Sequence, residues 1–180
     1  MTELSPVTKN FVLHWGELGA RWGISRTMAQ IHALLYISTK PLCHEEIAEY
    51  LNVARSNVST SIRELKSWGI VRVVHVMEDR RDHYEAIKDG WEMIRIILGE
   101  RMHREVQPTI EILQKCVDEA EATNEEEEVR ERFESLLDCV QTLNTAYEQI
   151  REIPTGVLVK LVKLGGKIPV KLGLFSKGSA

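Results

Sequence analysis

The 180-residue sequence predicts a mainly α-helical protein with one small β ribbon. Apolar residues recur at helical spacing through most of the chain. Between residues 70 and 87 the period changes to strand-like alternation, and from Trp91 onward a long helical pattern resumes. With 43% apolar and 28% charged residues, the composition is that of a globular chain and excludes wholesale disorder.

Four helices are expected before the ribbon, at about residues 7–21, 26–40, 44–51 and 55–68. Ser25 is placed to cap the second helix, and Pro41 ends it, because proline disfavours helical geometry in the residue before it. A turn at Asn52 separates the third helix from the fourth. Gly69 ends the fourth, at a position that commonly requires a left-handed backbone.

The ribbon consists of two expected strands, residues 70–76 and 83–87, joined by a charged turn at 78–82. The order helix, turn, helix, two-stranded ribbon is the plan of a winged helix-turn-helix domain. A helix of this kind has the right width for the major groove of DNA, where base edges present a distinct pattern of donors and acceptors.

Two long amphipathic helices are expected after the ribbon, the first with a kink at Pro108 and the second beginning near the acidic run Glu125–Glu128. A small domain cannot cover both apolar stripes, so they need each other or a second copy of the chain. The expected organisation is a DNA-binding domain over 1–88, a helical dimerisation region over 89–152 and a basic, apolar tail over 153–180.

Charge is unevenly distributed along the chain, although the net charge is only −4. Residues 91–150 hold six basic and fifteen acidic side chains, whereas residues 151–180 hold six and one. Residues 54–81 hold six and three, a local basic excess within the predicted DNA-reading elements.

The DNA contacts are expected from the exposed face of the fourth helix and from the wing. Short polar side chains and two guanidinium groups occupy that face, with no acid before Glu64. Base-edge contacts are assigned to Arg55, Ser56 and Asn57, and phosphate contacts to Ser59, Thr60 and Arg63. At the wing, Arg80 and Arg81 are candidates for the minor groove, where a flanking Asp, at 79 or 82, can hold one guanidinium in place while the other reaches out. The alternative is a solvated polar helix face and a hydrophilic hairpin.

Over roughly residues 10–120 the sequence resembles the GbsR branch of the MarR-type regulators. The resemblance rests on the runs Pro41–Glu49, Leu51–Ser59, Arg63–Gly69, Asp79–Ala86 and Trp91-Glu92. It implies a homodimer that binds an inverted repeat in double-stranded DNA, usually as a repressor, and a small osmolyte-type effector such as choline or betaine. Ala54 and Cys43 depart from the pattern, because the family commonly has a capping Ser or Thr there.

A choline-like effector would bind in an aromatic cage, since the face of an aromatic ring attracts a quaternary ammonium. The candidate residues are Trp15, Trp22, Tyr36, Tyr84 and Trp91. The alternative for these rings is ordinary core and hinge packing, which is also the role expected of Trp68.

No catalytic motif or phosphate-binding loop is present, so we expect no enzymatic activity and no cofactor. Cys43, Cys116 and Cys139 are widely spaced and predict neither a disulfide framework nor a zinc site. Without a signal peptide or an apolar run long enough to span a bilayer, the chain is expected to be soluble and cytoplasmic. Two alternatives stay open: a winged-helix protein adaptor, and a metal-responsive regulator using His75, His83 or Cys43.

Overall fold

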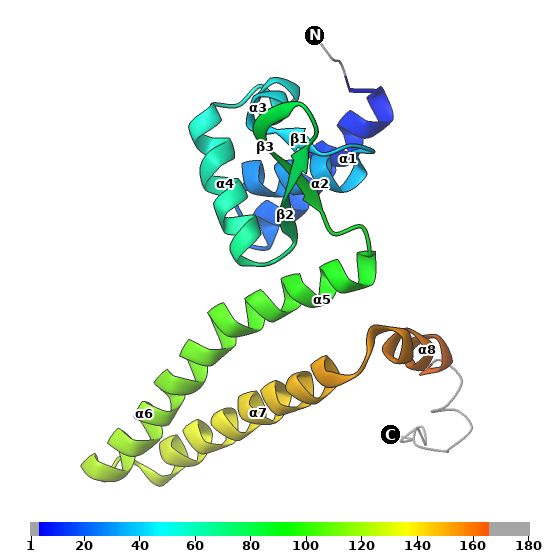
Figure 1. Cartoon of the computed structure of the whole chain (residues 1–180). Coiled ribbons are helices and arrows are strands. Elements are labelled where there is room, and N and C mark those ends of the chain that lie inside the picture. The colour runs from blue at the N-terminus through cyan, green and yellow to red at the C-terminus, as the bar shows by residue number, and fades with distance from the viewer. Residues whose placement is uncertain (1–3, 166–180) are drawn as a thin grey trace. The chain divides into compact units, whose positions relative to one another are not determined.

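The computed structural model describes residues 4–165, and contacts divide the chain into two compact units, residues 1–97 and 98–180. The first unit holds four helices and a small sheet, and the boundary falls within α5 (Figure 1). Its elements are α1 (Pro6–Arg21), α2 (Arg26–Ile37), β1 (Leu42–Cys43), α3 (His44–Leu51), α4 (Arg55–Ser67), β2 (Val71–Val76), β3 (Asp79–Ala86) and the start of α5 (Gly90–Arg101). The predicted mainly helical fold with a small β-wing is confirmed.

The core of the first unit forms where α2 packs against α1, α3, α4 and the sheet. Ile31, Leu35, Ile47 and Leu65 are almost fully buried, and each such side chain contributes about 1.5–3 kcal/mol when removed from water. The helices α1 and α2 approach closely at Gly19, where an added Cβ would lie 2.4 Å from the Cβ of Ala29. These contacts give the helix-turn-helix a rigid base.

Two left-handed residues bound the segment that presents α4. Asn52, with φ 51°, ends α3 and turns the chain, and Gly69, with φ 78°, follows α4 as expected. The N-terminus of α4 has Ala54 at its cap and no side-chain capping bond, and Ser25 likewise makes no capping bond to α2. Burial of Val58, Ser61, Ile62 and Leu65 therefore orients α4 more than local capping does.

The sheet has three antiparallel strands in the order β1-β3-β2, so the wing has one strand more than the sequence predicted. The two-residue β1 pairs Leu42 with Tyr84 and Cys43 with His83. The predicted turn at 78–82 was too long: β2 ends at Val76 and β3 begins at Asp79. Arg80 and Arg81 consequently lie within β3 and not at the turn.

Lys88, in the segment between β3 and α5, fastens that segment to the end of α2. Its ammonium donates hydrogen bonds to the carbonyl oxygens of Leu35, Tyr36 and Ser38, at 2.7, 2.9 and 2.8 Å. The last carbonyls of a helix lack partners within the helix, so this lysine satisfies groups that would otherwise need water.

Replacing Lys88 with methionine should lower the free energy of unfolding by roughly 1–2 kcal/mol, because it keeps the aliphatic stem and removes three charged hydrogen bonds. Urea denaturation of the full chain measures this loss. Lys66→Met, which removes a lysine with an exposed side chain on α4, is the matched control and should leave the midpoint unchanged. Equal midpoints for both variants would contradict the fastening role of Lys88.

The second unit contains the end of α5, η1 (Met102–Val106), α6 (Gln107–Thr123), α7 (Glu127–Glu152) and α8 (Thr155–Gly165). The irregularity expected at Pro108 takes the form of a π-helical stretch just before it, because proline provides no backbone N–H for the α-helical ladder. Residues 166–180 of the predicted tail lie outside the described residues. Within residues 4–165, no helix is long and apolar enough to cross a membrane.

The helices α6 and α7 pack against each other but leave much apolar surface uncovered. Leu113, Ala120 and Leu137 are the buried residues of the pair. Large apolar side chains on the same two helices stay exposed in the single chain: Ile112, Leu136, Leu143 and Ile150. Exposed apolar surface on this scale is typical of helices that pack against a partner.

Candidate DNA-binding surface

The outer face of α4 is polar and exposed along its whole length. Its buried face is held by the core, so the opposite face must point to solvent. All six predicted contact residues of this helix are exposed: Arg55, Ser56, Asn57, Ser59, Thr60 and Arg63. The structure thus puts these side chains on one accessible surface, without an acidic residue in the first turn of the helix.

Arg55 and Arg63 differ in their surroundings. The Nη1 of Arg55 lies 3.4 Å from Oε1 of Glu45 on α3, and both side chains are well exposed. An exposed pair of this kind is worth little, so Arg55 can exchange Glu45 for another acceptor at small cost. Arg63 forms no ion pair with any residue in the described part of the chain.

The two wing arginines lie on opposite faces of β3, because successive strand residues alternate. Arg81 shares its face with Asp79, and its Nε donates to Oδ1 of Asp79 at 3.0 Å. This contact holds the pKa of the Asp79 carboxyl well below its usual range. Arg80, on the other face, is exposed and makes no ion pair within residues 4–165, so its guanidinium is available to an external anion.

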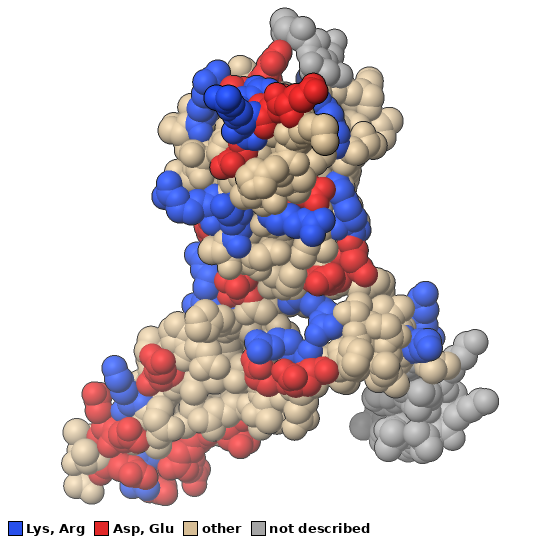
Figure 2. All heavy atoms as spheres, viewed as in Figure 1, with Lys and Arg blue, Asp and Glu red and all other residues tan. Residues whose placement is uncertain are grey.

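The charges of the two units differ, as expected from the sequence. Figure 2 shows Lys and Arg side chains around the first unit and a dense group of Asp and Glu where α6 meets α7. The acidic run Glu125–Glu128 spans that turn, and its members are exposed. Residues 1–97 hold twelve basic and twelve acidic side chains, so the first unit has no net charge and its basic excess is local to residues 54–81. The end of the α6–α7 pair, by contrast, repels a polyanion.

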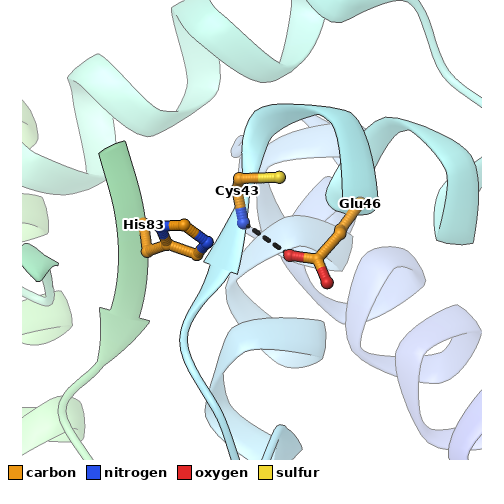
Figure 3. Close-up of side chains that lie close together, drawn as sticks. All are labelled: Cys43, Glu46 and His83. Atoms are coloured by element: carbon orange, nitrogen blue, oxygen red, sulfur yellow. Dashed lines mark hydrogen bonds between the residues drawn. The ribbon is translucent and has the colours of Figure 1, made fainter. Parts of the chain in front are cut away.

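A cluster of potential metal ligands lies at the base of the wing (Figure 3). Ligand atoms of Cys43, Glu46 and His83 all lie within 4.8 Å of one another. Cys43 and His83 meet because they are register partners of β1 and β3, and Glu46 follows on the first turn of α3. Burial raises the pKa of the Cys43 thiol, so in the absence of a ligand it is a protonated, unreactive group.

The first unit also encloses an apolar cavity of about 280 Å³ between α1, α2, α4 and α5. Three indole rings line it: Trp15, Trp22 and Trp68. His32 lines it as well, and its Nε2 has no hydrogen-bond partner among the described residues. Burial, together with the nearby charge of Lys88, lowers the pKa of His32 to about 4, so this imidazole is neutral at pH 7.

Only two of the five aromatic residues predicted for an effector cage, Trp15 and Trp22, line this cavity. Tyr36 lies 6.3 Å from the ring of His32, and Tyr84 packs edge-on against His44, 4.7 Å away in the wing. Trp91 is exposed at the start of α5.

Sequence reasoning missed several residues of these sites. Assigning Trp68 to core packing alone overlooked its place in the cavity wall. His32 could have been found from the sequence, because a histidine among the apolar residues on the buried face of α2 is unusual. The contact between Asp79 and Arg81 agrees with the prediction that a flanking Asp holds one wing arginine, but the approach of Asp79 to His83 was missed, because it follows only if β3 begins at residue 79.

Comparison with known proteins supports the fold. Residues 22–82, about a third of the chain, match the model of the MarR family. A solved structure described as the crystal structure of a transcriptional regulator aligns with a TM-score of 0.52 and 20% sequence identity. The alignment covers 80% of this chain and 99% of that one, and at this identity it shows the fold. A search of curated proteins gave no match.

Proposed function

We propose that this chain is a sequence-specific, DNA-binding transcriptional regulator without catalytic activity. The observation that carries the proposal is the exposed face of α4, which combines Arg55 and Arg63 with short hydrogen-bonding side chains beside an arginine-bearing wing. A helix with this face can enter the major groove while the wing lies along the adjacent backbone. The MarR-family match over the same segment supports this assignment.

Individual roles follow from position. Arg55, Ser56 and Asn57 occupy the first turn of α4, which is the part of a recognition helix that reaches base edges. Ser59, Thr60 and Arg63 lie further along and are assigned to phosphates. Arg80, which has no intramolecular ion pair within the described residues, is assigned to the minor groove. Arg81, on the opposite face of β3 and paired with Asp79, is the second candidate for that groove.

The regulator acts as a homodimer in this proposal. Residues 1–88 bind DNA, and residues 89–152 dimerise by covering the apolar surface that Ile112, Leu136, Leu143 and Ile150 expose. A two-fold dimer matches an inverted-repeat operator with half-sites about one helical turn apart. Repression, membership of the GbsR branch and action in the cytoplasm are part of the proposal and rest on the sequence resemblance. The tail over 153–180 is given no role.

The test is DNA binding by the purified chain across a salt series, using the duplex upstream of its own gene beside a scrambled duplex. Tight binding that prefers the upstream duplex, weakens steeply with salt and occurs at two chains per duplex supports the proposal. Equal and feeble binding to both duplexes by a stable dimer would favour the alternative of a winged-helix protein adaptor.

The effector of the proposed regulator is a quaternary ammonium of the choline or betaine class, bound in the cavity of the first unit. Three indole rings around an enclosed space suit such a cation, and a neutral His32 does not repel it. The structure changes the predicted cage, because Trp68 joins Trp15 and Trp22 while Tyr36, Tyr84 and Trp91 lie outside the cavity lining.

Calorimetric titration with choline should show saturable binding that Trp22→Leu weakens about tenfold, through loss of one cation–π contact. Trp91→Leu is the matched control, because Trp91 is as exposed as Trp22, 42% against 41%, and does not line the cavity. Absence of heat with the wild-type chain, or equal weakening in both variants, would rule out this effector site.

A further inference from the structure

We propose that Cys43, His83 and Glu46, with Asp79 as a fourth ligand, form a binding site for a divalent metal ion of the zinc class at the base of the wing. The residues come from three elements: β1 supplies Cys43, α3 supplies Glu46, and β3 supplies His83 and Asp79. Nothing in the proposed DNA-binding role requires these four side chains to meet.

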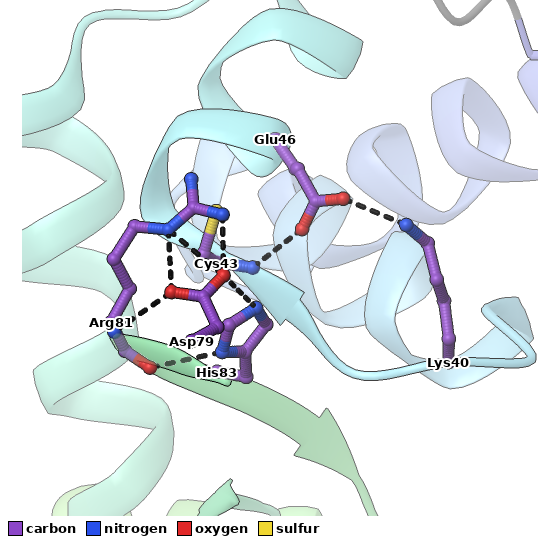
Figure 4. Close-up of polar contacts among 6 residues, drawn as sticks. All are labelled: Lys40, Cys43, Glu46, Asp79, Arg81 and His83. Atoms are coloured by element: carbon purple, nitrogen blue, oxygen red, sulfur yellow. Dashed lines mark hydrogen bonds and ion pairs between the residues drawn. The ribbon is translucent and has the colours of Figure 1, made fainter. Parts of the chain in front are cut away.

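The histidine is already oriented as a metal ligand. Its Nδ1 lies 2.9 Å from the backbone carbonyl oxygen of Arg81, and a carbonyl only accepts, so Nδ1 carries a hydrogen (Figure 4). In the neutral imidazole Nε2 is then an acceptor with a free lone pair. Metal-binding histidines are commonly oriented in this way: the ring nitrogen that does not bind the metal donates a hydrogen bond to a carbonyl oxygen.

A carboxylate lies close to this nitrogen. Nε2 of His83 is 3.5 Å from Oδ2 of Asp79, so the two atoms are close enough to share one metal ion. The His83 side chain is only 7% exposed, so water has little access to it. The Cys43 thiol provides a third donor atom next to the same space, within 4.8 Å of the imidazole.

The donor set matches zinc in kind and in dimensions. Thiolate sulfur, imidazole nitrogen and carboxylate oxygen are its usual ligands, at bond lengths of about 2.0–2.3 Å, which separate ligand atoms in a tetrahedron by about 3.5 Å. The separations among Cys43, Glu46 and His83, up to 4.8 Å, need inward shifts of about 1 Å, within reach of side-chain rotation, and Asp79 joins this group from the side of His83. On binding, Cys43 exchanges its S–H bond for an S–metal bond and releases the proton to solvent.

Two hydrogen bonds already hold the Glu46 carboxylate in position. One of its oxygens accepts from the backbone N–H of Cys43 at 2.9 Å, and the other accepts from the Lys40 ammonium at 2.8 Å (Figure 4). A carboxylate has lone pairs left for a metal after two hydrogen bonds. These bonds restrict the Glu46 side chain, which lowers the ordering cost of binding.

Metal occupancy is coupled to the wing through Arg81, an inference that rests on the proposed function. Asp79 is the partner of Arg81, so a metal that draws Asp79 toward His83 leaves the guanidinium without its carboxylate. The freed arginine gains affinity for a phosphate. Zinc should therefore strengthen DNA binding by the wild-type chain, whereas Asp79→Asn should already bind DNA like the metal-loaded protein and respond little to zinc.

The site itself is tested without DNA, by titrating the chelator-treated chain with Co²⁺ and then displacing it with Zn²⁺. One Co²⁺ per chain with thiolate-to-metal charge-transfer absorption is expected. Cys43→Ser should abolish that absorption and weaken Zn²⁺ binding at least about 100-fold, more than loss of an outer-shell group costs. Serine suits the helix cap at this position, so the variant should fold.

Cys139→Ser is the matched control, because Cys139 is an exposed thiol in the second unit, and it should leave Co²⁺ binding unchanged. His83→Gln should weaken binding as Cys43→Ser does. Binding that survives Cys43→Ser, or that is lost equally in Cys139→Ser, would overturn the site. A metal-binding chain that fails to bind any duplex would refute the proposed function and leave the site standing; unchanged DNA affinity on adding zinc would refute the coupling alone.

Discussion

Replacing Arg55 with alanine should weaken binding of the chain to its specific duplex by about 1–3 kcal/mol, which is a rise in Kd of about fivefold to 150-fold. The guanidinium lies at the N-terminal turn of α4, where a recognition helix reaches base edges, and its contact with Glu45 is exposed and easily broken. Loss of a base contact should also relax sequence preference at one position of each half-site. Affinity measured for single-base variants of the duplex detects this.

Arg63→Ala should behave differently, because we assign this residue to a phosphate. It should weaken binding to specific and scrambled duplexes alike and reduce the slope of log K against log salt by about one.

Arg26→Ala is the matched control for Arg55→Ala: Arg26 is an exposed arginine of the same unit, paired with Glu17 as Arg55 is with Glu45. Equal losses in Arg26→Ala and Arg55→Ala would show general electrostatic attraction in place of a recognition face.

The second large effect expected is a loss of stability in mild acid that is caused by His32. The pKa of this histidine is about 4 in the folded chain against 6.5 in an unfolded one. Between these values the unfolded state binds more protons than the folded state, so stability falls as the pH falls from 6.5 to 4. The contribution of this one residue between pH 7 and pH 4 is about 3 kcal/mol.

His32→Phe isolates this contribution, since phenylalanine keeps a ring beside Trp15 and Tyr36 and cannot be protonated. Urea denaturation of both proteins from pH 7 to pH 4 should show the wild-type chain losing about 3 kcal/mol more stability than His32→Phe, whichever protein is more stable at pH 7. Parallel curves would mean that His32 is protonated equally well in the folded and unfolded states.

Local sequence patterns predicted most elements of the first unit, because short helices and strands are indicated by the spacing of apolar residues and by the residue types at their ends. The apolar spacing located α3 and α4 to within a residue, and Gly69 marked the end of α4. The two-residue β1 carries no detectable period and was missed. The length of the wing turn was also wrong, since the charged side chains at 79–82 that suggested a turn belong to the first half of β3, where Asp79 pairs with Val76 beside a register shift.

The candidate DNA surface was predictable for a similar reason. Val58, Ile62 and Leu65 of α4 face the core, and the residues of the opposite face are exposed to solvent. The helical spacing of these three apolar residues is enough to distinguish the two faces. The partner of Arg55 was not predictable, because Glu45 reaches it from another helix. At the wing, the sequence predicted that a flanking Asp could hold one guanidinium, and Asp79 pairs with Arg81 in this way.

What the sequence determined by itself is therefore the order of the helices, the wing and the polar face of α4, all of which depend on residues a few positions apart. Only the tertiary structure decided which distant residues meet. Register between β1 and β3 brings Cys43 to His83, and packing of four helices encloses the cavity beside His32. The physical reason is that periodicity determines which face of an element a side chain occupies, whereas the neighbour across that face is chosen by how whole elements pack.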